Sequence, residues 1–221
     1  MNHKEQSPKR RFDSSSFMPA GDSAELPIHP DLADPAPGSS EALGMSAPIV
    51  LVPVGELDEE VLQLVKGPVE QVFARTIEVG TPLPVPKYAF NPTREQYHSA
   101  AILKRVESAR LDSWSAAVGI TDLDLFVPEV PFVFGEADRS TRSAIISLNR
   151  MRSTLGSVTT RQEVLRRRFV SELIHQMGLI KGLAHCPNNR CVMFQSTSVQ
   201  DTDKRGIQFC ANCRKRLVLD N

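Results

Sequence analysis

The four cysteines of the chain constrain its fold most strongly, because all of them lie between residues 186 and 213. Their order is Cys186, four residues, Cys191, a longer spacer, and then the pair Cys210-x-x-Cys213. Four thiolates in two close pairs are what a closed, tetrahedral structural zinc requires. We therefore expect zinc in a small C-terminal lobe that these cysteines tie together. A redox pair and unliganded buried thiols are the alternatives.

Charge and hydropathy exclude several classes of protein. The chain carries 26 Lys and Arg against 26 Asp and Glu, so no net field steers it to nucleic acid or acidic lipid. No apolar run approaches the roughly 18 residues that span a bilayer. The N-terminus lacks the apolar run of about 7–15 residues found in secretory signals. We expect a cytoplasmic protein with neither a membrane nor a nucleic-acid partner, in which clustered cysteines favour metal over disulfides.

The composition changes near residue 46. Residues 1–46 are rich in Ser, Pro, Ala and Asp and show no apolar periodicity, which is typical of a disordered extension. The remaining residues, 47–221, are long enough for one well-packed domain.

Strands alternate with helices along the first half of this domain. Strands are expected over 49–54, 75–79, 114–126, 132–134 and 143–148, and helices after Asp58 and over 94–110. The polar segment 135–142 is interpreted as a loop that joins the strands 132–134 and 143–148. This hairpin would add an antiparallel strand near one edge of the sheet. The pattern predicts an α/β fold with a mixed, mostly parallel sheet covered by helices.

A longer helix is expected from about Arg161 to Ile180, after a capping box made by Thr160 and Glu163. Its core side repeats at helical spacing, with Leu165, Phe169, Leu173, Met177 and Ile180. His175 and Leu179 lie one turn apart on another face. Gly182 then permits a sharp turn, after which His185 can fold back towards the helix.

This stretch resembles the archaemetzincins, a family of zinc metallopeptidases with the pattern HExxHxxGxxHC, four residues, Cys-x-Met, a spacer and CxxC. The chain matches that pattern at His175, Gly182, His185, Cys186, Cys191, Met193, Cys210 and Cys213. Upstream segments also look like family blocks, among them Asn91 to Tyr97 and Phe132 to Ala137. The resemblance covers roughly residues 48 to 217.

The resemblance implies a metzincin-like fold with two zinc sites. Three histidines would hold a catalytic zinc, a glutamate would activate its bound water, and four cysteines would hold a structural zinc. Residue by residue, His175 and His185 take ligand positions and Met193 takes the methionine turn beneath the metal. Gln176 stands at the general-base position, however, and Leu179 stands at the position of the second histidine ligand.

These two replacements act directly on the chemistry. Leucine has no donor atom, whereas a catalytic zinc keeps three protein ligands and one position for water. A glutamine accepts no proton, and loss of a general base typically costs about 10²–10⁴ in rate. We therefore expect a member of the family that is inactive or severely impaired, with His175, His185 and Met193 as remnants of the catalytic zinc site or as ordinary core residues.

Other interpretations remain open from the residues alone. A site built from Glu172, His175 and His185 would give an active zinc peptidase with an unusual ligand set, and His98 is a further candidate for the cleft. A third reading makes the cysteine module a zinc knuckle on nucleic acid, aided by Arg205 and by residues 214–216, against which the zero net charge argues. If hydrolysis is lost, the cleft is expected to bind a peptide or protein along the strand near Phe132 to Phe134.

Overall fold

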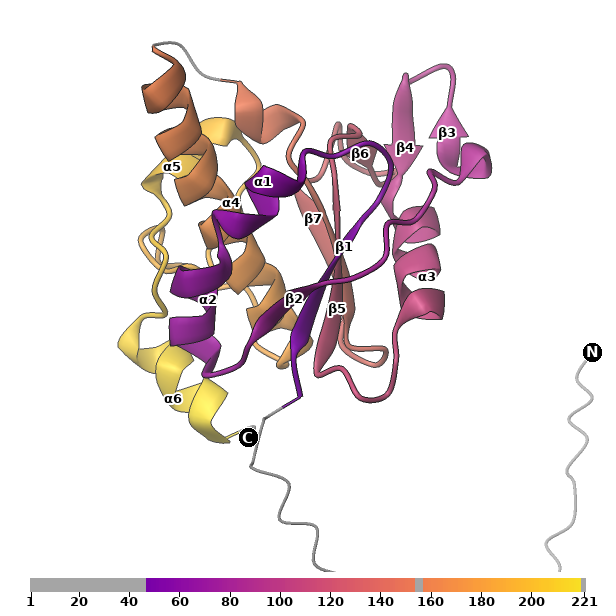
Figure 1. Cartoon of the computed structure of the whole chain (residues 1–221). Coiled ribbons are helices and arrows are strands. Elements are labelled where there is room, and N and C mark those ends of the chain that lie inside the picture. Colours follow the sequence, from indigo (N-terminus) through magenta and orange to yellow (C-terminus); the bar gives the residue numbers. More distant parts are fainter. Residues whose placement is uncertain (1–46, 154–156, 220–221) are drawn as a thin grey trace, which may run out of the picture. The chain divides into compact units, whose positions relative to one another are not determined.

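A computed structural model describes residues 47–153 and 157–219 of the chain (Figure 1). The expected extension, residues 1–46, lies outside the described residues. The main sheet has five strands in the order β2-β1-β5-β8-β7. Its members are β1 (Ile49–Pro53), β2 (Ile77–Val79), β5 (Ala116–Thr121), β7 (Gly135–Asp138) and β8 (Ser143–Ser147). The first three pairings across the sheet are parallel and β7 pairs antiparallel to β8. The expected mixed, mostly parallel sheet is confirmed.

Helices cover both faces of this sheet. On one face lie α1 (Glu59–Gln63), α2 (Lys66–Phe73) and the long α4 (Val158–Ile180), and on the other lies α3 (Ser99–Ala109) (Figure 1). A second, smaller sheet joins β3 (Phe90–Asn91), β4 (Gln96–His98) and β6 (Leu125–Phe126). Two 3₁₀ turns, η1 (Lys87–Ala89) and η2 (Arg150–Arg152), and the C-terminal helices α5 (Val199–Lys204) and α6 (Ala211–Leu219) complete the described elements.

The core explains why the central strands read as continuous apolar runs. Every residue of β1, β5 and β8 is buried, because helices pack on both sides of the sheet. Side chains alternate between the two cores: Val118 packs on the α4 side, whereas Ala117 packs on the α3 side.

Several element boundaries differ from the sequence-based expectation. The segment 132–134 is not a strand, and the strand instead occupies Gly135–Asp138, which the sequence assigned to a loop. The helix expected from Arg94 begins at Ser99, because Gln96 to His98 form β4. The capping box at Thr160 is also wrong, since Ser157 is the N-cap and accepts a hydrogen bond from the Thr160 backbone N–H at 3.2 Å. Asp58 does cap α1 as expected.

Among the described residues, no helix is long and apolar enough to cross a membrane.

Candidate functional site

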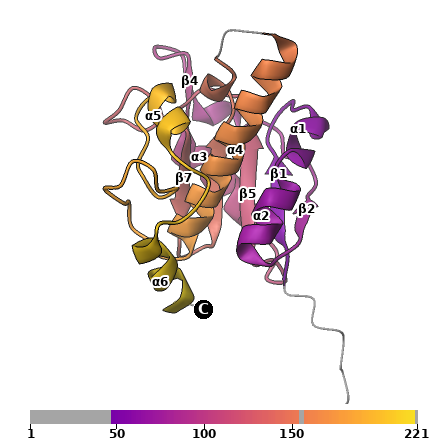
Figure 2. The same ribbon diagram turned by 90° about the vertical axis from the view of Figure 1, so that its left-hand side faces the viewer.

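Helix α4 carries the candidate site in its second half. From Arg168 to Gly178 every residue is buried, because the sheet covers one side of the helix and the C-terminal segment covers the other (Figure 2). All five residues of the expected core side are buried. The polar side chains of Glu172, His175 and Gln176 therefore sit deep in the protein, where each needs a partner.

The turn after α4 brings His175 and His185 together. Gly182 adopts φ +88°, and a Cβ there would lie 2.5 Å from the Arg139 guanidinium carbon. The chain then returns so that the His185 ring stacks on the His175 ring, with 5.4 Å between centroids and 12° between planes. His175 Nδ1 lies 2.8 Å from the Val192 carbonyl oxygen. Because that oxygen only accepts, Nδ1 carries the proton and Nε2 of the neutral ring keeps its lone pair.

Burial decides the protonation of His175. Loss of solvent lowers the pKa of His175 to about 4, although the nearby Glu172 carboxylate favours the charged form. Partial burial also lowers the pKa of His185. Both rings are therefore neutral near pH 7.

Both carboxylate oxygens of Glu172 accept hydrogen bonds. Its Oε2 accepts from Nη2 of Arg205 at 2.5 Å, and its Oε1 accepts from Nε2 of Gln176 at 2.7 Å. Burial is the largest influence and would raise the pKa of Glu172, but the Arg205 charge and the hydrogen bonds from Arg205 and Gln176 contribute to a combined effect that lowers it. Arg205 is 1% exposed and also donates to Ser171 Oγ and the Phe194 carbonyl. Arg205 is therefore shielded from solvent, whereas binding to nucleic acid would need it exposed.

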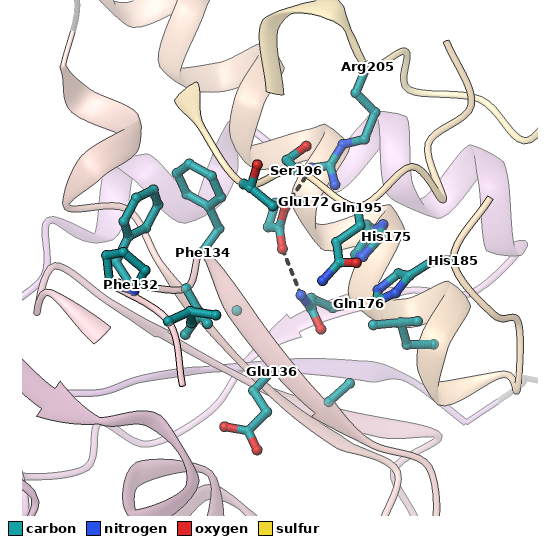
Figure 3. Close-up of a pocket in the computed structure, with 17 residues that line it drawn as sticks. Phe132, Phe134, Glu136, Glu172, His175, Gln176, His185, Gln195, Ser196 and Arg205 are labelled. Atoms are coloured by element: carbon teal, nitrogen blue, oxygen red, sulfur yellow. Dashed lines mark hydrogen bonds and ion pairs between the residues drawn. The ribbon is translucent and has the colours of Figure 1, made fainter. Parts of the chain in front are cut away.

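These side chains line a cleft of about 500 Å³ between α4 and β7 (Figure 3). Its walls come from residues 130–137, from Glu172, His175, Gln176 and Leu179 on α4, and from His185, residues 195–197 and Arg205. Leu179 lines the cleft and packs on the core. Gln195, Ser196 and Arg205 were not foreseen as cleft residues, since only folding brings them to α4. His98 is not among the lining residues, and its ring packs edge-to-face on Phe126.

The four cysteines meet in one cluster below the helix. Their Sγ atoms all lie within 4.8 Å of one another. A tetrahedral zinc with bonds of about 2.3 Å holds its sulfurs roughly 3.8 Å apart, so the donor set and its spacing fit zinc. Among the described residues this is the only group of three or more His, Cys, Asp or Glu side chains placed to hold a metal.

Local contacts favour a thiolate in this cluster. The backbone N–H of Cys213 has the largest part in lowering the pKa of Cys210, to about 7. Burial raises the pKa of Cys191 and of Cys213. A divalent cation would offset this burial cost, because thiolates are the metal-binding form of cysteine.

Met193 links the cysteine cluster to the helix. It is fully buried, and a Cβ on Gly178 would lie 2.4 Å from its Sδ, so this glycine permits the close approach. The Cys186 backbone N–H donates to the Met193 carbonyl at 2.9 Å, and the Val192 N–H donates to the Gln208 carbonyl at 3.0 Å. One short loop therefore carries a cysteine of the cluster, the carbonyl that orients His175, and the methionine beneath α4.

Comparison with known proteins decides the family. A model of the peptidase family M54 matches residues 55–218. The chain is 35% identical over 169 residues to the archaemetzincin of Methanocaldococcus jannaschii, covering 76% of this chain and 92% of that protein. It is 36% identical over 176 residues to the archaemetzincin of Thermococcus kodakarensis, covering 77% and 95%. The chain belongs to the archaemetzincin family.

Solved archaemetzincin structures share the fold. The crystal structure of the Archaeoglobus fulgidus archaemetzincin superposes with a TM-score of 0.65 at 28% identity, covering 76% of this chain and 99% of that one. The Methanopyrus kandleri archaemetzincin gives a TM-score of 0.69 at 26% identity, covering 79% and 96%. The family, the fold and a cysteine cluster suited to zinc are thus established for this archaemetzincin.

Proposed function

We propose that this archaemetzincin is a non-catalytic member of its family, which keeps a structural zinc at its four cysteines and uses its cleft to bind peptide. The single observation that carries the proposal is the pair of replacements on α4, where Gln176 and Leu179 stand beside His175. Both side chains line the cleft.

Leu179 limits metal binding because its side chain offers no ligand atom. His175 and His185 supply two imidazoles, whereas a catalytic zinc needs three protein ligands and a position for water. Glu172 is a poor third ligand, since its two oxygens already accept from Arg205 and Gln176. Breaking that buried ion pair would leave the Arg205 charge uncompensated.

Gln176 removes the general base that hydrolysis of a peptide bond would need. Its carboxamide takes up no proton near neutral pH, so it does not activate water as a glutamate does. Its Nε2 is also turned towards Glu172, which fixes the orientation of the group.

The cysteine cluster supports a retained structural zinc. Cys186, Cys191, Cys210 and Cys213 would hold the ion, which closes a tetrahedral site and supplies folding energy rather than catalysis. The ion would connect the loop after α4 to the start of α6. It would thereby stabilise the segment that supplies His185 and residues 195–197 to the cleft.

The free edge of β7 supports peptide binding. Among the residues that the structure describes, β7 is the edge strand of the sheet and pairs only with β8. The Ser147 N–H donates to the Phe134 carbonyl, so the alternation of an antiparallel ladder leaves the backbone groups of Gly135 and Ala137 at the free edge. A peptide strand could pair there, at Gly135–Asp138 and not at Phe132 to Phe134, where the edge was first expected. Phe132 and Phe134, whose rings are 5.1 Å apart, would meet its side chains.

A cleavage assay tests the proposal. Wild-type protein loaded with zinc is expected to leave denatured casein and short peptides intact. The double variant Gln176→Glu/Leu179→His restores the general base and the third ligand, and we expect it to bind a second zinc and to gain cleavage that a chelator abolishes.

Gln162→Glu serves as a matched control, because it adds the same charge on the exposed face of α4 and should gain nothing. Chelator-sensitive cleavage by the wild type would overturn the proposal.

A further inference from the structure

The Gln176 carboxamide has only one orientation that its surroundings accept. Its Nε2 lies 2.7 Å from Glu172 Oε1, and the other Glu172 oxygen is held by Arg205. An ionised carboxylate only accepts hydrogen bonds, so the amino group must face Glu172 and Oε1 must face away from it.

That oxygen is buried and has no hydrogen-bond partner among the described residues. The Gln176 side chain is 3% exposed and lines the cleft. Ser196 Oγ is a second buried polar atom of the same cleft, and it too finds no hydrogen-bond partner within the described part of the chain. Since buried polar atoms in folded proteins are nearly always paired, these two point to a ligand that supplies the missing partner.

His175 contributes a further acceptor. Its Nδ1–H is donated to the Val192 carbonyl, which leaves the Nε2 lone pair unused by that bond. His175 and Gln176 line the same cleft. Gln176 Oε1 and His175 Nε2 therefore offer two acceptors to a ligand, and the Ser196 hydroxyl can either donate or accept.

Charge adds to this preference. The side chains lie in the order Arg205, Glu172 and Gln176, with the carboxylate between the guanidinium and the carboxamide (Figure 3). The negative end of the ion pair is thus the end next to Gln176. A carboxylate that accepts from Nε2 polarises the carboxamide and makes Oε1 a stronger acceptor, because linked hydrogen bonds strengthen one another.

We propose that this part of the cleft binds a primary ammonium group, with Gln176 Oε1 and His175 Nε2 as the accepting atoms. The inference rests on the proposed function, since a catalytic zinc at His175 would occupy Nε2. An ammonium carries three N–H donors and no acceptor, which complements the unpaired oxygen and the ring nitrogen. The group comes either from the N-terminus of a partner chain or from one of its lysine side chains.

Titration of the ¹⁵N-labelled full-length protein with small amines tests the proposal by NMR. Three probes are used at millimolar concentration: trialanine, N-acetyl-trialanine, and Nα-acetyl-lysine amide. We expect the Gln176 side-chain NH₂ signals to shift with an amine probe and to stay unchanged with N-acetyl-trialanine. A response to trialanine alone or to the lysine derivative alone identifies the source of the ammonium.

Gln176→Met keeps the size of the side chain and removes the acceptor, so binding followed at neighbouring backbone amides should weaken about tenfold or more. Gln162→Met, on the exposed face of the same helix, should bind as the wild type does. Should Gln176→Met fail to fold, the three probes on the wild type still decide the question.

Measurable shifts of the same size with trialanine and N-acetyl-trialanine would overturn the ammonium site while leaving peptide binding in place. Absence of any shift with both amine probes would overturn it too. Failure of the proposed function itself is seen separately, as chelator-sensitive cleavage by the wild type.

Discussion

Arg205 and Glu172 form an ion pair whose side chains are only 1% and 4% exposed. A charge buried to this degree is tolerated only with its partner, so removing either one should be far worse than removing both. Arg205→Met is expected to lower the free energy of unfolding by about 3–5 kcal/mol. Urea denaturation measures this loss.

The double variant Arg205→Met/Glu172→Gln provides the matched comparison, because it leaves no unpaired charge, and it should recover most of the lost stability. Equal stability losses in the single and double variants would contradict the burial argument.

The low pKa of His175 makes stability depend on pH. The ring takes up a proton near pH 6.5 when unfolded but near pH 4 when folded, so the unfolded state binds more protons between these values. Stability should therefore fall as the pH drops from 6.5 towards 4, by up to about 3 kcal/mol from this ring.

His175→Gln should reduce this slope and leave a smaller one from His185, whose pKa is also lowered. The measurement is the urea midpoint between pH 7 and pH 5. An unchanged slope in His175→Gln would show that His175 is not the buried neutral ring described above.

At the scale of elements, α4 packs closely on the loop of Met193 at Gly178, where there is no room for a side chain. Gly178→Ala would place a methyl group 2.4 Å from Met193 Sδ in a fully buried position. Overpacking of this kind costs about 1–3 kcal/mol, which thermal denaturation would detect as a lower Tm.

Gly67→Ala is the matched control in α2, because none of the described residues places an atom within 4 Å of the added methyl. Its gain in helix propensity is opposed by the restriction that Pro68 places on residue 67, so the change should stay below about 1 kcal/mol. A Gly178→Ala variant as stable as this control would rule out the close packing.

The sequence predicted those elements whose signal is local. The apolar runs of β1 and β8 and the core side of α4 were confirmed, since periodicity and burial follow from neighbouring residues. β7 was misplaced because its sequence, Gly-Glu-Ala-Asp, has no β-branched or aromatic residue, and only its pairing with β8 makes it a strand. The place of Arg205 in the cleft was not predicted for a similar reason, since its partner Glu172 lies 33 residues away.

At the scale of the whole molecule, the C-terminal segment stabilises the second half of α4, and the cysteine cluster holds that segment in place. The Cys191 loop pairs with the Gln208 segment, and the Cys210 N–H donates to Cys191 Sγ at 3.3 Å. Loss of a structural metal is among the largest single effects on stability, so Cys213→Ser or chelation should cost more than about 4 kcal/mol.

Calorimetry with and without chelator measures this cost. An unchanged unfolding transition after complete removal of zinc would contradict a stabilising role for the cluster.

The zinc content of the purified protein tests the loss of the catalytic site most directly. Elemental analysis should find one zinc per chain in the wild type, the same in His175→Ala, and none in Cys213→Ser. Two zincs per chain in the wild type, falling to one in His175→Ala, would mean that a metal sits against α4 despite Leu179 and would contradict the account.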